Sequence, residues 1–402
     1  MGFAARLRAL MTERRVGVRA LARQVPCDAA LVSRLANGRQ RPSPQIARRL
    51  DDVLGAVGEL VALAADPLAE VAVPASVPDA ASDELAALEL ARRAAASDVG
   101  AATIARLELA VDELAVAYPG TPPAVLLDRV RPYLAYTGRL IGGRATLAEH
   151  KRLLVTGGWL SLLAATCLID LHRDHAAAEH LRTAAQLAQE TGHGELAAWC
   201  LETRAWQVLT TGDFPRAAEV AQAAQRTAPR GSSAFIQATA QEGRAHARLG
   251  DRPATYAALA RVETLVSPLP MPDQPEHHYR YDPAKSQAYV ATTLSWLGDP
   301  AAEPEARQVL ARLESTTDGP PRPRRAASAR LDLSLALVAT GRHDEAAGTV
   351  LEAVTSGRLV PSNYWRAREV IEAVAARGVP EARELGDAYQ ETCRETGRPA
   401  LP

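Results

Sequence analysis

The sequence predicts an all-α protein in two parts, a small N-terminal bundle of helices followed by a long array of helical hairpins. Three observations predict this class. Alanine, leucine and arginine dominate the 402 residues, and only 4% are aromatic, a composition that favours helices over sheets. The length exceeds that of a usual single domain. Turn-forming residues also recur at intervals of 37 to 48 residues from Leu171 onward.

The first part, residues 1–65, is expected to hold five short helices between residues 3 and 64. Residues 18–38 have the apolar spacing of two short helices that cross at a tight turn. Asp28 is placed to cap the second of these helices, which we expect to run over residues 29–36 and to end at Asn37-Gly38. The apolar residues that carry this spacing are Leu21, Ala22, Val25, Val32 and Leu35.

Residues 66–82 contain three prolines and no helical period, which predicts a linker between the first part and a second part at 83–402. Beyond it, a turn follows a helix and precedes an Ala-rich helix six times. These turns lie at 171–174, 211–214, 249–252, 297–300, 340–343 and 377–380. A hairpin of this size cannot bury its own apolar face, so the hairpins are expected to stack as a solenoid. Gly142-Gly143 and Gly157-Gly158 are expected to break helices.

Charge is divided unevenly along the chain. Residues 1–60 carry eleven arginines, no lysine and five acidic residues, a net charge of +6, which leaves −7 for the remainder. A basic first part on an acidic body is typical of a phosphate-binding module fused to a domain that does not bind DNA. The four cysteines form no C-x-x-C pair, and neither a signal peptide nor an 18-residue apolar run is evident. We therefore expect a reduced cytoplasmic protein, associated with the nucleoid and not with a membrane.

Residues 3–64, and above all Ser33-Arg34-Leu35-Ala36-Asn37-Gly38, resemble the phage-repressor (Cro/C1, or XRE) helix-turn-helix family, whose fold is the lambda-repressor-like bundle. The resemblance implies that the helix at 29–36 enters the major groove of double-stranded DNA, with Arg34 the main guanine reader. The alternative is a helical bundle with a solvated arginine surface. The expected base-facing residues are Ala29, Ala30, Ser33 and Arg34, and the expected phosphate-binding residues are Arg19, Arg39 and Arg41.

The second part resembles the tetratricopeptide repeat (TPR), with its best unit from about Ala198 to Pro229, where Gly212 and Phe214 match the inter-helix turn. By this resemblance Trp159, Trp199 and Trp365 occupy equivalent positions, and a TPR-like groove is expected to bind a peptide, a small molecule or a protein. The alternative is that these tryptophans only pack between helices. The expected ligand-binding residues are Trp159, Trp199, Glu202, Trp206, Gln237, Arg244 and Lys285.

An insertion at 267–284 is the least helical stretch of the second part. His277, His278 and Asp282 are conceivable metal ligands, but a His-His pair without a spaced third ligand favours a loop that folds over the groove. No phosphate-binding loop, serine-hydrolase elbow or H-E-x-x-H motif occurs. The sequence therefore predicts no enzyme, no cofactor and no metal.

Together the two resemblances imply a bacterial transcription regulator, a homodimer whose DNA binding is set by a ligand in the repeat groove. The competing hypothesis is an interaction scaffold, in which the groove binds another protein and the first part only tethers it to DNA.

Overall fold

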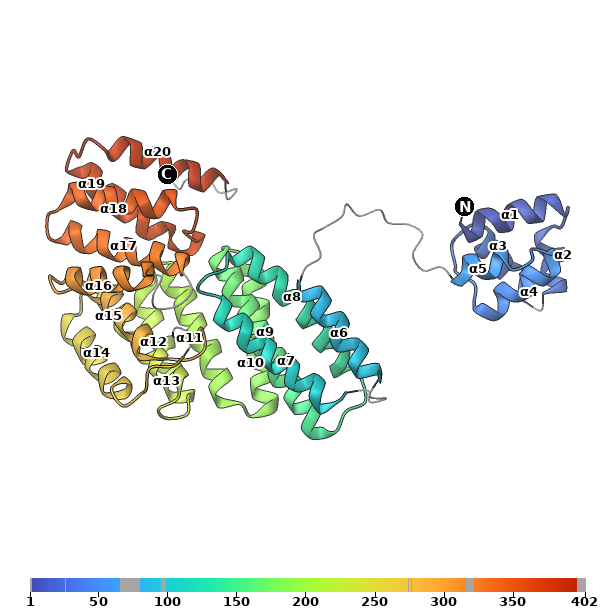
Figure 1. Ribbon diagram of the computed structural model, residues 1–402, viewed down its shortest axis with the longest axis horizontal. Helices are drawn as coiled ribbons and strands as arrows, with labels where there is room; N and C mark the ends of the chain where they lie inside the picture. The colour runs from blue at the N-terminus through green and yellow to red at the C-terminus, as the bar shows by residue number, and fades with distance from the viewer. Residues whose placement is uncertain are drawn as a thin grey trace. The chain divides into compact units, whose positions relative to one another are not determined.

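The structure is a computed structural model that describes residues 2–25, 27–65, 80–94, 99–273, 275, 277–315 and 322–395. It forms two compact units, residues 1–77 and 78–402, drawn in Figure 1. The described residues form helices and no strand, which confirms the predicted all-α class. Most of the expected linker lies outside the described residues. Its last three positions, 80–82, already belong to a helix, because alanines there favour that conformation.

The first unit contains five helices, and their caps follow the sequence signals. Asp28 accepts a hydrogen bond from the Ala30 backbone N–H at 2.9 Å, and Gly38 ends the next turn with φ +68°, as predicted. A glycine is favoured there because a Cβ is strained at positive φ. The helices are α1 (Phe3–Glu13), α2 (Val18–Gln24), α3 (Ala29–Ala36), α4 (Pro44–Leu54) and α5 (Glu59–Ala65).

Hydrogen bonds between helices, together with a shared apolar core, join the short helices of this unit. The buried Asp51 carboxylate accepts hydrogen bonds from the N–H groups of Gly58 and Leu60 at 2.6 and 2.7 Å, so α4 caps the N-terminus of α5. Arg8 donates to the Ala36 carbonyl at 2.5 Å and joins α1 to the end of α3. The unit's core includes Leu7, Leu21, Val32, Leu35, Leu50 and Leu60.

The second unit begins with three helices and continues as helical hairpins stacked in chain order (Figure 1). The first three helices are α6 (Ala80–Ala94), α7 (Ala101–Ala117) and α8 (Pro123–Ile141). The hairpins are α9 (Leu147–Asp170) with α10 (Asp174–Thr191), α11 (Gly194–Thr210) with α12 (Phe214–Thr227), α13 (Ser233–Arg248) with α14 (Arg252–Val266), α15 (Pro283–Leu297) with α16 (Ala302–Glu314), α17 (Pro323–Ala339) with α18 (His343–Thr355), and α19 (Tyr364–Ala376) with α20 (Ala382–Glu395).

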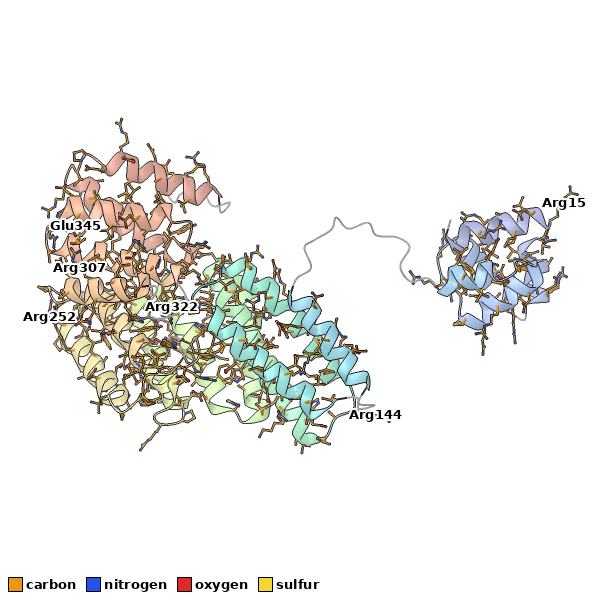
Figure 2. All side chains as sticks on the ribbon, viewed as in Figure 1. Arg15, Arg144, Arg252, Arg307, Arg322 and Glu345 are labelled. Carbon is orange, nitrogen blue, oxygen red and sulfur yellow. The ribbon has the colours of Figure 1, made fainter. Side chains whose placement is uncertain are left out.

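The six turns found in the sequence are the turns inside these hairpins. The first helices of successive hairpins also contact one another, from α9 to α19, and form the inner face of the array. The short 3₁₀ helix η1 (Pro361–Asn363) precedes α19. The outer helices carry exposed ion pairs, such as Arg307 with Glu345 at 2.5 Å (Figure 2). Exposed pairs of this kind contribute little to stability.

One glycine prediction is wrong. Gly142 follows α8 as expected, but Gly157 and Gly158 lie inside α9 and break nothing. Helix α11 packs so closely here that a Cβ on Gly158 would lie 2.5 Å from Leu196 Cδ2. The glycine therefore permits close helix packing. Helix α9 is also the one described helix long and apolar enough to cross a membrane, but 83% of its apolar window is buried inside the molecule, as in a core helix.

The array closes on itself through Asp170, at the C-terminal end of α9. Its carboxylate, buried in the protein, accepts hydrogen bonds from Tyr118 at 2.7 Å, Arg324 at 2.5 Å and Ser362 at 2.9 Å. The neighbouring His172 Nε2 lies 2.8 Å from the Pro361 carbonyl. The first hairpin is thus joined to α17 and η1, more than 150 residues later in the chain.

Replacing Asp170 with alanine is expected to lower the free energy of unfolding by about 3–5 kcal/mol, because Arg324 would remain buried without its carboxylate. Thermal and denaturant unfolding of the full chain measure the loss. In Asp128→Ala, which removes an exposed pair with Arg131, the loss is expected to stay below about 1 kcal/mol. Equal stability of the two variants would contradict a structural role for the closure.

Candidate DNA-binding surface and interior cavity

The residues predicted to contact DNA lie on α2, on α3 and in the turn after α3. Arg34 and Ala30 are exposed on α3, whereas Ala29 and Ser33 are only partly exposed. Arg19 on α2 and Arg39 and Arg41 after α3 are all exposed.

Arg34 is held by a residue that the sequence did not single out. Its Nε–H donates to Gln40 Oε1 at 2.8 Å, and Gln40 is the only hydrogen-bond partner of the Arg34 side chain among the described residues. The forked Nη1 and Nη2 end of the guanidinium therefore stays available. A guanine offers two acceptors to such a fork in the major groove. No spacing rule would have found Gln40, because it lies in an irregular turn.

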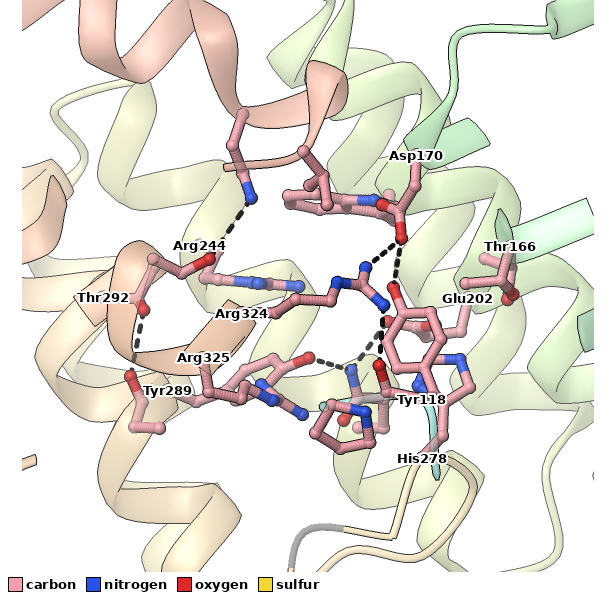
Figure 3. Close-up of a pocket in the computed structure, with 18 of the residues that line it drawn as sticks. Tyr118, Thr166, Asp170, Glu202, Arg244, His278, Tyr289, Thr292, Arg324 and Arg325 are labelled. Carbon is pink, nitrogen blue, oxygen red and sulfur yellow. Dashed lines mark hydrogen bonds and ion pairs between the residues drawn. The ribbon is translucent and has the colours of Figure 1, made fainter. Parts of the chain in front are cut away.

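In the second unit, an interior cavity of about 140 Å³ lies on the inner face of the hairpins. Four of the predicted ligand-binding residues, Glu202, Trp206, Gln237 and Arg244, line it together (Figure 3). The closure of the array adds lining residues that no repeat pattern indicated. These are, among others, Tyr118, Asp170, Arg324, Asn363 and Arg366.

A chain of hydrogen bonds crosses one wall of the cavity. Gln237 Nε2 donates to Glu202 Oε1 at 2.9 Å and to the Tyr289 hydroxyl at 2.5 Å. Burial raises the pKa of Glu202, while the hydrogen bond from Gln237 and the charges of Arg244 and Lys285 oppose that shift. The cavity also borders a buried ion pair, because Arg366 in its lining pairs with Asp332.

The insertion packs onto the inner face and engages two predicted residues that line none of the described cavities. The ammonium of Lys285 donates to the backbone carbonyls of His277, His278 and Arg280 at 3.3, 2.7 and 3.2 Å. Trp199 is 1% exposed, and its ring centroid lies 5.4 Å from that of Tyr279. Both residues therefore hold the insertion in place.

Trp159 also contacts the insertion, with its ring centroid 4.8 Å from that of Tyr279. It lines a second, larger cavity of about 540 Å³, together with Asp112, His277 and Arg280. Trp365, at the equivalent position of the last hairpin, packs against Trp296 with centroids 5.5 Å apart.

The three conceivable metal ligands make other contacts. His277 Nδ1 accepts from the Tyr279 N–H at 3.1 Å, His278 stacks on Tyr118 with centroids 4.0 Å apart, and Asp282 caps α15 by accepting from the Lys285 N–H at 2.8 Å. Across the described ranges, no group of three His, Cys, Asp or Glu side chains is placed to hold a metal ion.

A comparison with known protein families matches one part of this chain, its N-terminal residues. Residues 3–64 match the family model described as a helix-turn-helix domain, and the match spans α1 to α5. The N-terminal unit carries a helix-turn-helix domain. Its presence indicates a DNA-binding regulator. A search of curated proteins found no significant match to the chain.

The insertion is expected to make stability depend on pH. Burial, with the charges of Arg280 and Lys285, lowers the pKa of His277 to about 4 although Asp112 opposes the shift. An unfolded histidine binds its proton near pH 6.5. The folded state thus stays neutral where the unfolded state gains a proton, and stability is fully present above about pH 6.5 and falls toward pH 4.

The expected slope is about 1.4 kcal/mol per pH unit for each such histidine. Melting temperatures of the full chain between pH 7 and pH 5 measure it. His277→Gln is expected to reduce the slope, whereas replacing the exposed His175 with glutamine leaves it unchanged. An identical slope in the His277 variant would show that another group causes the dependence.

Proposed function

We propose that the protein is a sequence-specific transcription regulator of the XRE type, acting as a homodimer, in which a ligand bound inside a TPR-like second unit controls DNA binding. The basic helix-turn-helix domain with its exposed Arg34 carries the first half of this proposal. Binding to an operator would place the protein on the nucleoid, in the cytoplasm. The paired DNA-binding units of a dimer would then contact two half-sites.

The roles proposed for individual residues follow from their positions. Arg34, fixed at Nε by Gln40, is proposed to read a guanine with its forked end. Ala29, Ala30 and Ser33 are proposed to face neighbouring bases, where small residues contact thymine methyl groups. The exposed Arg19, Arg39 and Arg41 are proposed to bind phosphates, which sets register and salt dependence.

The interior cavity carries the second half of the proposal. Its lining includes residues of the inner helix of each hairpin, of η1, of the insertion and of the turn after α7. One small molecule there would lie where the two ends of the closed array meet. The insertion already packs against Trp159 and Trp199. This arrangement favours a small molecule over an extended peptide, and it disfavours the scaffold hypothesis, which needs room in the groove for another protein.

Arg34→Ala is expected to abolish discrete peaks in genome-wide crosslinking and to cost about 1–3 kcal/mol at the recovered operator, mainly through lost discrimination of one base. Gln40→Leu is expected to act in the same direction but less strongly. Arg39→Ala serves as the control, because loss of a phosphate contact weakens all sequences alike and reduces the salt slope by about 1. Peaks that persist in Arg34→Ala would remove it as the base reader.

Filling the cavity tests control by a ligand. Ala288 lines the cavity on α15, so Ala288→Phe is expected to occupy the ligand's space and to change operator affinity at least about fivefold. Affinity is measured by fluorescence anisotropy with the operator recovered above. The matched control is Ala257→Phe, at an exposed position of α14. Unchanged affinity in a folded Ala288→Phe protein would refute control through this cavity, and failure to recover any operator would favour the scaffold.

A further inference from the structure

A buried guanidinium that forms no ion pair with any described residue projects into the cavity. Arg244 on α13 is 7% exposed and lines the cavity, and Figure 3 shows it among the central side chains. Its Nη2 donates to Gln241, its Nε has no hydrogen-bond partner, and it forms no ion pair with any described residue. Because a buried unpaired charge is costly, this arrangement points to a missing anion.

Neighbouring aromatic rings fix the orientation of Arg244. Its guanidinium carbon lies 4.3 Å from the ring centroid of Tyr289, 5.1 Å from that of Trp206 and 5.7 Å from that of Trp296. Cation–π contacts stabilise a charge only in part, and they engage the faces of the guanidinium, so that its Nε–H, unlike Nη2, has no acceptor. The group is therefore preorganised for an oxyanion.

Arg244 differs from the lining arginines that form ion pairs. Arg244, Arg324 and Arg366 all line the cavity. The carboxylates in or beside the lining are Asp170, Glu202 and Asp332, of which Asp170 pairs with Arg324 and Asp332 pairs with Arg366. Burial raises the pKa of Glu202, which weakens the one lining carboxylate without an arginine ion pair. Among these three arginines, Arg244 is thus the one without a carboxylate in ion-pair contact among the described residues.

The size and walls of the cavity restrict the remainder of the ligand. A volume of about 140 Å³ is close to that of a cavity that binds benzene, about 150 Å³. Trp206 and Tyr289 are only partly buried and face this space. Both side chains offer a flat ring to an aromatic group of the ligand.

We propose that the cavity binds a compact aromatic acid, with its oxyanion group on Arg244 and its ring against Trp206 and Tyr289. This inference rests on the proposed function, because it names the chemical class of the controlling ligand. It concerns binding alone, however, and therefore stands or fails separately from any effect on DNA.

Thermal unfolding of the full chain with benzoate, phenyl phosphate, inorganic phosphate or benzamide tests the proposal at constant ionic strength. Benzoate or phenyl phosphate at about ten times its dissociation constant is expected to raise Tm by about 2 °C. Neutral benzamide, of the same shape as benzoate, is expected to leave Tm unchanged. Inorganic phosphate alone is expected to give a smaller rise, because it makes no ring contact.

Variants of α13 assign the effect to one residue. Arg244→Gln is expected to abolish the Tm rise and Arg244→Lys to weaken it, because an ammonium offers no fork. Arg248→Gln is the matched control: Arg248 lies one turn further on, also on aromatic rings, but is paired with Glu369 at 3.0 Å. Isothermal titration calorimetry repeats the comparison for any variant whose melting curve is altered.

Three results would overturn the proposal: no response to any acid, an equal response to benzamide, or a response that persists in Arg244→Gln. Operator binding with and without benzoate then separates the two claims. Acid binding that leaves operator affinity unchanged would retain this site and refute ligand control. A change in operator affinity upon Ala288→Phe without acid binding would retain control and refute this ligand class.

Discussion

The architecture of the second unit depends on one buried carboxylate. Asp170 ends the first inner helix, and its ion pair with Arg324 spans 154 residues of sequence. Burying two charges costs more than their attraction returns unless further hydrogen bonds satisfy both groups. Here Tyr118 and Ser362 donate to Asp170, and Arg324 also donates to two backbone carbonyls, those of Tyr118 and Thr121. The pair therefore fixes α9 against α17 and η1.

Closure changes the environment of the polar residues on the inner helices. In an open solenoid, Glu202, Gln237 and Arg244 would face water and their charges would be screened. In the closed array each of them is at most 7% exposed, so every unpaired group counts more heavily in the lower dielectric. The insertion adds to this effect by packing its own rings against Trp159 and Trp199. The inner face is therefore not a solvated groove. It is an interior whose buried polar groups need specific hydrogen-bond or ionic partners.

What the sequence predicted correctly was encoded locally. The cap at Asp28, the glycine at 38 and the six hairpin turns each depend on residues within a few positions of one another. The closure could not be predicted, because its partners are 150 to 200 residues apart and no periodicity relates them. For the same reason a count of groove positions grouped Lys285 with the cavity residues, while the structure places its ammonium on the insertion's carbonyls. Gly158 likewise reads as a helix break until Leu196, its packing partner, is known.

A ligand-controlled regulator needs two conformations that bind the ligand with different affinity. A ligand that binds both equally well does not change their populations. The unpaired Arg244 supplies a physical source for that difference. In the proposed mechanism its buried charge would destabilise the closed array without an anion, and the same charge would stabilise it with one. Because the lining spans the inner helices from α9 to α17, together with η1 and α19, the change in energy falls on the closure as a whole. Whether Arg244 binds an anion would therefore set the stability of the closed array. The DNA-binding units of the proposed dimer would respond to that change in stability.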